Sequence, residues 1–298
     1  MDLQLHGKTN LAIELAKKVN GEIVSCDSMQ IYKEMNIGTA KPTIEEMNGI
    51  MHYMIDIVDP EERFSVSEYK IQAEKCIQKI LSKNKVPIVV GGTGLYLNSL
   101  LYNIEYAETK MNEKYREELE RRAETHGLES LYNEARKIDK EAMMKISPND
   151  KKRIIRVLEI YKETGKTKTE QELNSRKKDI PFDYHVFAIN FDRQILYDRI
   201  NKRVDTMIKN GLIQEVEHLT KNYPNMKTAI QSIGYKEVLE YLEGNLTKEE
   251  MIEKIKQETR RYAKRQITWF KKNKNTIWID GLESKEKNIQ TIIEEVYK

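Results

Sequence analysis

His6-Gly7-Lys8-Thr9-Asn10 runs directly into an apolar-periodic segment, which predicts a helix starting at this stretch. The next segment, Glu22-Ile23-Val24-Ser25, reads as a short strand. A Gly-Lys-Thr sequence that opens a helix is the second half of a phosphate-binding loop, because main-chain N–H groups and the helix N-terminus attract anionic oxygens. In that interpretation Lys8 adds a positive charge and Thr9 offers a hydroxyl to Mg²⁺.

The first half of the loop pattern is absent. The pattern G-x-x-x-x-G-K-[ST] needs a glycine where this chain has Asp2, so on the tripeptide alone an ordinary helix start fits equally well. Asp27 offers a second clue, because it follows the strand at the sheet edge where open α/β folds bind ligands. A carboxylate that faces a phosphate site suggests chemistry between a phosphorylated donor and a proton-bearing acceptor.

Composition narrows the class of protein. The chain has 298 residues, of which 39% are hydrophobic and 33% charged, enough for one large α/β domain with an insertion or for two domains. Lys and Arg number 51 against 48 Asp and Glu, so any case for nucleic-acid binding rests on local clusters. Cys26 and Cys76 are too few for a disulfide framework, and the histidines lack zinc-ligand spacing. We expect reduced thiols, a cytoplasmic location and no membrane span or signal peptide.

Strands and helices alternate at both ends of the chain. His52–Ile57 and Val86–Val90 read as further strands, and Gly91-Gly92-Thr93-Gly94 turns the second of them into a helix. Tyr184–Ile189 and Thr276–Ile279 return to the strand pattern. This alternation predicts an α/β fold with a parallel sheet and flanking helices.

The middle of the chain reads as an all-helical insertion. We expect an α/β core at 1–110, the insertion at 111–180, and the rest of the core at 181–298. Capping signals place several helix starts, with Ser65, Asp192 and the Thr247–Glu250 capping box among them. The expected insertion helices are 112–126, 128–137, 140–146, 151–164 and 167–177.

Two basic clusters interrupt a chain of nearly balanced charge. One is Lys151-Lys152-Arg153 with Arg156, and the other runs from Arg260 to Lys274 with aromatic residues between the charges. Charge runs are usually solvated faces, but two such clusters favour a surface for a polyanion. Arg199 and Arg203, four residues apart on one helix, suit either surface ion pairs or a pyrophosphate.

Taken together, the motifs resemble those of the tRNA dimethylallyltransferase family, also called tRNA isopentenyltransferases. The matching blocks run in family order over nearly the whole chain. They are Gly7-Lys8-Thr9, Ser25-Cys26-Asp27-Ser28-Met29-Gln30-Ile31-Tyr32, Ile37-Gly38-Thr39-Ala40-Lys41-Pro42, Asp56-Ile57-Val58-Asp59-Pro60, Val90-Gly91-Gly92-Thr93-Gly94-Leu95-Tyr96, Ser147-Pro148-Asn149-Asp150, Ile233-Gly234-Tyr235-Lys236 and Lys264-Arg265-Gln266-Ile267-Thr268-Trp269-Phe270.

The resemblance implies a P-loop-kinase-like core whose helical insertion grips the anticodon stem-loop of tRNA. It implies transfer of a dimethylallyl group from dimethylallyl diphosphate to N6 of the adenosine at position 37, next to the anticodon, with Mg²⁺. Asp27 would take the N6 proton and Thr93 would contact the substrate. The diphosphate would be held by Gly7, Lys8, Thr9 and Arg203, and Thr9 would contribute its hydroxyl to the metal.

The resemblance also implies a tRNA-binding surface, and we expect a monomer. The implied tRNA-binding residues are Asp27, Ser28, Met29, Gln30, Thr93, Lys152, Arg153, Ile154, Ile155, Arg156, Gln231, Ser232, Ile233, Gly234, Tyr235, Lys236, Arg260, Arg261, Lys264, Arg265 and Gln266.

Two other functions stay open at this point. A small-molecule or nucleotide kinase is disfavoured, because no carboxylate follows the strand at Val89-Val90 to hold Mg²⁺. A non-catalytic RNA-binding protein is compatible with the incomplete loop. We expect instead an N-terminally shortened form of a working enzyme, less stable and weaker in donor binding than a chain with the full strand and loop.

Overall fold

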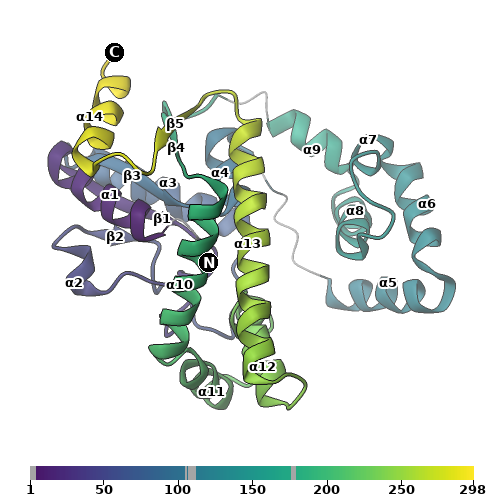
Figure 1. The fold of residues 1–298 in the computed structure, drawn as a ribbon. Coiled ribbons are helices and arrows are strands. Elements are labelled where there is room, and N and C mark those ends of the chain that lie inside the picture. The colour runs from purple at the N-terminus through teal and green to yellow at the C-terminus, as the bar shows by residue number, and fades with distance from the viewer. Residues whose placement is uncertain (1–4, 105, 107–111, 176–178) are drawn as a thin grey trace. The chain divides into compact units, whose positions relative to one another are not determined.

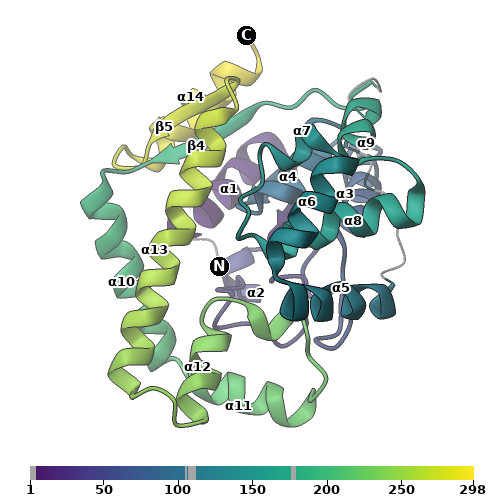
Figure 2. The same cartoon turned by 90° about the vertical axis from the view of Figure 1, so that its right-hand side faces the viewer.

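The computed structural model describes residues 5–104, 106, 112–175 and 179–298. The chain divides into two compact units. Unit 1 combines residues 1–97 with 184–298, and unit 2 comprises residues 98–183. The predicted α/β class with parallel strands is confirmed, and Figures 1 and 2 show the elements of each unit.

Unit 1 contains two small parallel sheets. In the first, β1 (Gly21–Cys26) lies between β2 (His52–Tyr53) and β3 (Val86–Gly91) and is parallel to both. In the second, β4 (Val186–Asn190) pairs with β5 (Thr276–Asp280), again in parallel. Every residue of β1 is buried, as expected for a central strand covered on both faces.

The helices of unit 1 cover these sheets and extend beyond them. They are α1 (Leu5–Val19), α2 (Ile44–Met47), α3 (Val66–Leu81), α4 (Gly94–Leu101, whose last residues belong to unit 2), α10 (Arg193–Lys209), α11 (Leu212–Asn222), the 3-10 helix η1 (Ala229–Gln231), α12 (Tyr235–Leu242), α13 (Lys248–Lys272) and α14 (Lys285–Val296).

Helices α1 and α3 sandwich the first sheet. Figure 1 shows α1 in front of β1 and β3 and α3 behind them. Ile13 and Ala16 of α1 are buried against Ile23 of β1. Ser65 caps α3 as predicted, with its side chain accepting the N–H of Glu68. The carboxyl ends of the three strands therefore open at one edge of the sheet.

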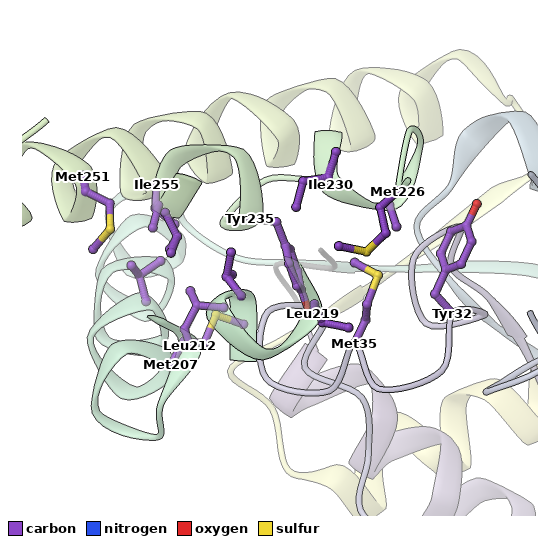
Figure 3. Packing of buried hydrophobic residues seen from close by; sticks show 14 of the residues in the cluster. Tyr32, Met35, Met207, Leu212, Leu219, Met226, Ile230, Tyr235, Met251 and Ile255 are labelled. Carbon is purple, nitrogen blue, oxygen red and sulfur yellow. The ribbon is translucent and has the colours of Figure 1, made fainter. Parts of the chain in front are cut away.

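The largest core of unit 1 lies where α10, α11, α12 and α13 meet the loop after β1 (Figure 3). Tyr32 and Met35 from that loop pack with Leu212, Tyr235 and Met251. The long helix α13 packs along α10 in both views (Figures 1 and 2). This core joins the first sheet's loops to the second half of unit 1.

Among its described residues, the regular secondary structure of unit 2 is all helical. Its helices are α5 (Glu113–His126), α6 (Leu128–Ile138), α7 (Lys140–Met143), α8 (Lys151–Thr164) and α9 (Lys168–Ser175). Leu119, Leu131, Ile154 and Leu158 form its core. Gly165 ends α8 in the left-handed conformation, as the sequence predicts.

Several sequence predictions of elements were wrong in extent. The strand predicted at Tyr184–Ile189 is observed over Val186–Asn190. The strand predicted at His52–Ile57 ends at Tyr53, because Met54 and Asp56 adopt positive φ of 62° and 53°. The helix predicted at 140–146 ends at Met143. The helix predicted at 167–177 is observed over Lys168–Ser175, and residues 176–178 lie outside the described residues.

Candidate active site

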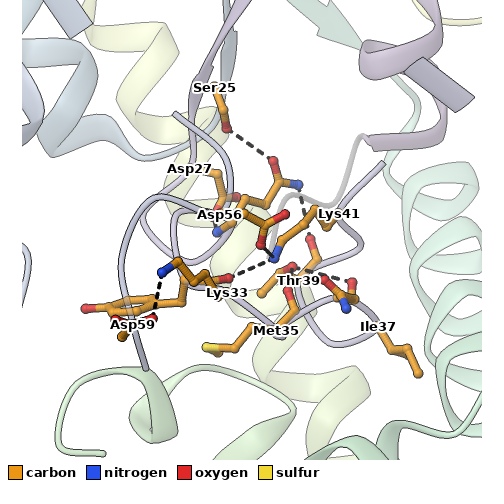
Figure 4. A network of polar contacts seen from close by, with 12 residues as sticks. Ser25, Asp27, Lys33, Met35, Ile37, Thr39, Lys41, Asp56 and Asp59 are labelled. Carbon is orange, nitrogen blue, oxygen red and sulfur yellow. Dashed lines mark hydrogen bonds and ion pairs between the residues drawn. The ribbon is translucent and has the colours of Figure 1, made fainter. Parts of the chain in front are cut away.

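Asp27 follows the last residue of β1 and is buried, with 3% of its surface exposed. Its Oδ1 accepts main-chain N–H groups of Met29 at 2.8 Å and Gln30 at 3.2 Å. Aspartate often closes a turn this way, because its short side chain reaches the main chain two residues on. The chain turn after β1 therefore fixes the orientation of the carboxyl group (Figure 4).

Thr93 reaches this turn from the neighbouring strand. Its hydroxyl accepts the N–H of Ser28 at 3.0 Å and donates to the Ser28 hydroxyl at 3.3 Å. Its main-chain N–H donates to the Cys26 carbonyl at 3.2 Å. The close approach needs a glycine before it, since a Cβ built on Gly91 would lie 2.2 Å from the Cys26 carbonyl oxygen. The glycine turn thus brings the two predicted catalytic residues onto adjacent segments.

A pocket opens at this edge of the sheet, and Thr9 and Asp27 both line it. Its walls combine apolar side chains with a few polar groups, as ligand sites usually do. The other lining residues are Ile23, Ser25, Gln30, Pro42, His52, Ile55, Val90 and Gly91.

A lysine with a buried side chain, Lys41, precedes the pocket residue Pro42 (Figure 4). Lys41 donates to the Tyr32 carbonyl at 2.8 Å and forms an ion pair with Asp56. Burial lowers the pKa of Lys41, against the opposing effect of Asp56. Ala40 and Asp56 both adopt positive φ, a strained conformation for residues with a side chain. The pair therefore ties together the two loops that hold these residues.

The phosphate-binding stretch lies in the first turns of α1. The helix begins at Leu5, so the main chain of Gly7 is already helical, while Asp2 lies outside the described residues. The Lys8 ammonium lies 5.4 Å from the centre of the Phe270 ring. Arg203 is half-buried on α10, and the guanidinium of Arg199 stacks over the Phe191 ring at 4.4 Å.

Helix α13 carries the second basic cluster and also contacts the glycine turn. The Gln266 amide donates to the Gly92 carbonyl at 3.0 Å. Trp269 packs against Gly94, where a built Cβ would meet ring atoms at 2.8 Å. Arg261 and Arg265 of the same helix are exposed, the first paired with Glu258.

The remaining cations of this stripe differ in exposure. Lys264 is exposed beside Arg261 and Arg265. Arg260 is half-buried, and it donates to Asn201 at 2.8 Å and pairs with Glu253. The exposed cations of this cluster are therefore Arg261, Lys264 and Arg265, with Lys271, Lys272 and Lys274 at its end.

The Gln231–Lys236 segment supports the loop after β1. The ring of Tyr235 is buried and lies so close to Gly38 that a built Cβ would meet it at 2.3 Å. Gln231 is exposed, whereas Ser232, Ile233 and Lys236 are half-buried. Gly234 starts α12 at φ 97°. The I-G-T-A-K-P and I-G-Y-K motifs, distant in sequence, therefore meet.

In unit 2, the first basic cluster divides between surface and core. Lys152 and Arg153 are exposed at the start of α8, and Arg156 is half-buried near the carboxylate of Glu159. The side chains of Ile154 and Ile155 are buried in the core of the unit. An RNA contact by these two isoleucine side chains is therefore incompatible with the observed packing, because a phosphate needs an exposed donor.

Oxygen donors at the pocket suit a magnesium ion. Mg²⁺ prefers hard oxygen ligands and usually takes only one or two from protein, with the rest from water and substrate phosphates. The Thr9 hydroxyl, which lines the pocket, is such a donor. Among the described residues no group of three His, Cys, Asp or Glu side chains forms a complete metal site.

Sequence reasoning missed two residues of this region. His52 lines the pocket, its Nδ1 donates to the Ile50 carbonyl at 2.9 Å, and burial lowers its pKa. Glu215 of α11 accepts hydrogen bonds from the loop after β1. A lone histidine in a strand and a glutamate in an amphipathic helix carry no local signal, because their partners are set by the tertiary fold.

Comparison with known proteins gives a consistent result. The family model for IPP transferase matches residues 30–273. A tRNA dimethylallyltransferase of Acetivibrio thermocellus is 50% identical over 289 residues, covering 96% of this chain and 92% of that protein. No helix among the described residues has the length and apolar character that crossing a bilayer requires.

Solved structures agree with the sequence comparison. A tRNA delta(2)-isopentenylpyrophosphate transferase from Staphylococcus epidermidis is 43% identical, with a TM-score of 0.71 and coverage of 98% and 96% of the two chains. A full-length tRNA isopentenylpyrophosphate transferase from Bacillus halodurans is 41% identical, with a TM-score of 0.73 and coverage of 98% and 92%.

Proposed function

This chain belongs to the tRNA dimethylallyltransferase family, and from that premise we propose that it transfers a dimethylallyl group from dimethylallyl diphosphate to N6 of the adenosine at position 37 in tRNA. The observation that carries the proposal is that Asp27 and Thr9 line one pocket, while Thr93 is bonded to Ser28, the residue that follows Asp27. The acceptor is the base next to the anticodon. The product is an isopentenyladenosine.

The reaction needs a base, because the exocyclic amine of adenine is a poor nucleophile whose lone pair is delocalised into the ring. Asp27 accepts a proton from N6 as the bond from nitrogen to the dimethylallyl carbon forms and the bond from that carbon to the diphosphate oxygen breaks. The two N–H groups on its Oδ1 orient the carboxyl group toward one position. Burial of Asp27 excludes competing water.

The leaving group is pyrophosphate, whose developing charge must be neutralised. Lys8, the Thr9 hydroxyl, the main chain at Gly7 and the guanidinium of Arg203 hold it in this proposal. A magnesium ion bound through Thr9 and the diphosphate would supply further positive charge there.

The tRNA is held by charge and by the pocket. Exposed cations on α13 and α8 contact phosphates of the anticodon stem-loop, and the target base is turned out of its stack into the pocket. In this proposal Asp27–Gln30, Thr93, Gln266 and the Gln231–Lys236 segment also contact the tRNA. We expect the protein to act as a monomer in the cytoplasm.

Replacing the proposed base tests the assignment. Asp27→Asn keeps the shape of the side chain but removes its ability to take a proton. We expect the single-turnover transfer rate to fall by roughly 10²–10⁴-fold, with tRNA affinity nearly unchanged. The assay combines dimethylallyl diphosphate, Mg²⁺ and unmodified tRNA, and measures the modified nucleoside by mass spectrometry after digestion.

Asp198→Asn is the matched control, because Asp198 is exposed on α10 and bonds only locally to Gln194. A near-normal rate for Asp27→Asn would remove Asp27 from the role of base. ATP turnover without RNA would favour a kinase instead, and tight tRNA binding without transfer by the unchanged chain would favour an RNA-binding protein.

A further inference from the structure

The carboxylate of Glu215 accepts hydrogen bonds from main-chain N–H groups of the loop after β1. The inference drawn from these contacts rests on the proposed function. Glu215 Oε2 accepts the N–H groups of Asn36 at 2.9 Å and Ile37 at 2.7 Å. Its Oε1 accepts the N–H of Gly38 at 3.0 Å and the hydroxyl of Tyr235 at 2.6 Å. Successive N–H groups that converge on one anion form a nest, and hydrogen bonds to a charged acceptor are stronger than neutral ones.

The loop bound in this way is tightly folded and strained. Ala40 donates to the Ile37 carbonyl at 3.0 Å, and Lys41 donates to the Asn36 carbonyl at 2.9 Å. Ala40 adopts φ 47°, which a residue with a side chain rarely holds without support from its surroundings. Glu215 holds residues 36–38 of this loop from outside it.

The inner side of the loop contacts Gln30. The Gln30 amide donates to the carbonyls of Thr39 and Ala40, both at 3.3 Å, and its oxygen accepts the Ser25 hydroxyl at 3.2 Å. The main-chain N–H of Gln30 is one of the two donors to Asp27. A continuous set of hydrogen bonds therefore runs from Glu215 through the loop and Gln30 to Asp27.

We propose that Glu215 is a positioning residue for the transfer reaction. It fixes the loop at residues 36–41, the loop fixes Gln30, and Gln30 fixes the direction of the Asp27 carboxylate. Pro42, which follows the loop, lines the pocket with Asp27, so the same contacts hold one wall of the pocket. Glu215 itself touches no reacting atom. Misplacement of a catalytic group by about 1 Å can cost about 10²-fold in rate.

The test is Glu215→Gln, which keeps the size of the side chain but removes its charge and one acceptor. We expect the single-turnover rate at saturating donor and tRNA to fall by about 10- to 100-fold. We expect the tRNA dissociation constant to stay within about twofold, because phosphate contacts by cations elsewhere supply most of the affinity. Glu217→Gln is the control, since Glu217 is exposed on the same helix, and it should match the unchanged chain in both measurements.

Three results would overturn the inference. One is an unchanged rate at saturation in Glu215→Gln, and another is weaker tRNA binding that accounts for the whole loss. The third is a lower melting temperature with a normal rate per active site, which would make Glu215 merely structural. If Glu215→Gln fails to fold, Tyr235→Phe removes one of the bonds to the carboxylate and should still lower the saturated rate by about threefold. Absence of transfer by the unchanged chain would instead count against the proposed function.

Discussion

Glu22 is a buried carboxylate at the other end of β1 from the site. It accepts hydrogen bonds from Lys85 at 2.7 Å, Lys83 at 2.9 Å and the Tyr53 hydroxyl at 2.8 Å. Burial acts to raise the pKa of Glu22, but the bonds from Lys85, Lys83 and Tyr53 outweigh it and lower the pKa from 4.5 to about 2. The charged form is therefore stabilised by folding, and it clamps β1 to β2 and to the start of β3.

This depressed pKa predicts a specific pH dependence. Because the folded-state pKa lies below 4.5, the stabilisation is complete above pH 4.5 and is lost as the pH falls toward 2. Glu22→Gln should be less stable than the unchanged chain at neutral pH by up to about 3 kcal/mol. The gap should close on acidification, as measured by urea unfolding at a series of pH values. The same gap at every pH would contradict the assignment, and Glu217→Gln serves as the control.

At the scale of elements, β1 and β3 pair in register from Gly21 with Val86 to Cys26 with Gly91. Their separation at the site end depends on the missing side chain of Gly91, whose built Cβ would lie within 2.8 Å of three main-chain atoms of Cys26. Main-chain atoms of a central strand cannot move aside as a flexible side chain can. This contact sets the distance between the Asp27 turn and Thr93.

Gly91→Ala should therefore force the strands apart. We expect a loss of about 3 kcal/mol in unfolding free energy, measured by urea denaturation, together with a large fall in transfer. Gly49→Ala is the comparison, because Gly49 has φ 78° and open space around it, so only backbone strain of about 1 kcal/mol is added there. Equal losses for the two variants would show that steric contact with Cys26 is unimportant.

Elements with strong local signals were predictable from sequence, and those defined by distant partners were not. The capping box at Thr247 correctly predicted the start of α13, and Asp192 caps α10 as expected. Nothing local marks the end of β2, because the left-handed turns at Met54 and Asp56 are held by Lys41 and the loop after β1. Helices α11 and α12 were not predicted, because they are stabilised by packing against Met35 and Tyr32, which are distant in the sequence.

The same distinction applies to the candidate site. Asp27 and the glycine turn were found because parallel strands bring their carboxyl ends to one edge. Their direct contact through Ser28 and Thr93 follows from the strand order, which the sequence alone does not specify. Glu215 was missed because its hydrogen-bond donors are main-chain N–H groups of residues 36–38, which are far from it in the sequence.

For the whole molecule, the positions of the exposed cations matter more for binding a polyanion than the net charge does. The net charge is only +3, yet Arg261, Lys264 and Arg265 lie exposed on one helix of unit 1, and Lys152 and Arg153 lie exposed on unit 2. Binding of a polyanion by such clusters releases counterions, so its strength falls as salt rises. The slope of log affinity against log salt concentration therefore reports the number of phosphate contacts.

Replacing Arg261 and Arg265 by Ala should weaken tRNA binding and flatten the plot of log affinity against log salt by up to about two units, roughly one for each lost contact. The control replaces Lys285 and Lys287 by Ala. This change removes the same amount of charge from α14, where both lysines are exposed. A slope identical to that of the unchanged chain would mean that the α13 stripe is only a solvated face.

The packing of Trp269 against Gly94 also gives the molecule an optical reporter. The chain has two tryptophans, and the other, Trp278, lies in β5. The Trp269 ring meets the Phe270 ring edge-on at 4.8 Å, and that ring in turn lies under the Lys8 ammonium. Indole emission responds to the polarity and charge around it. In a chain with Trp278 replaced by Phe, the remaining fluorescence would therefore follow donor binding directly, without any attached dye.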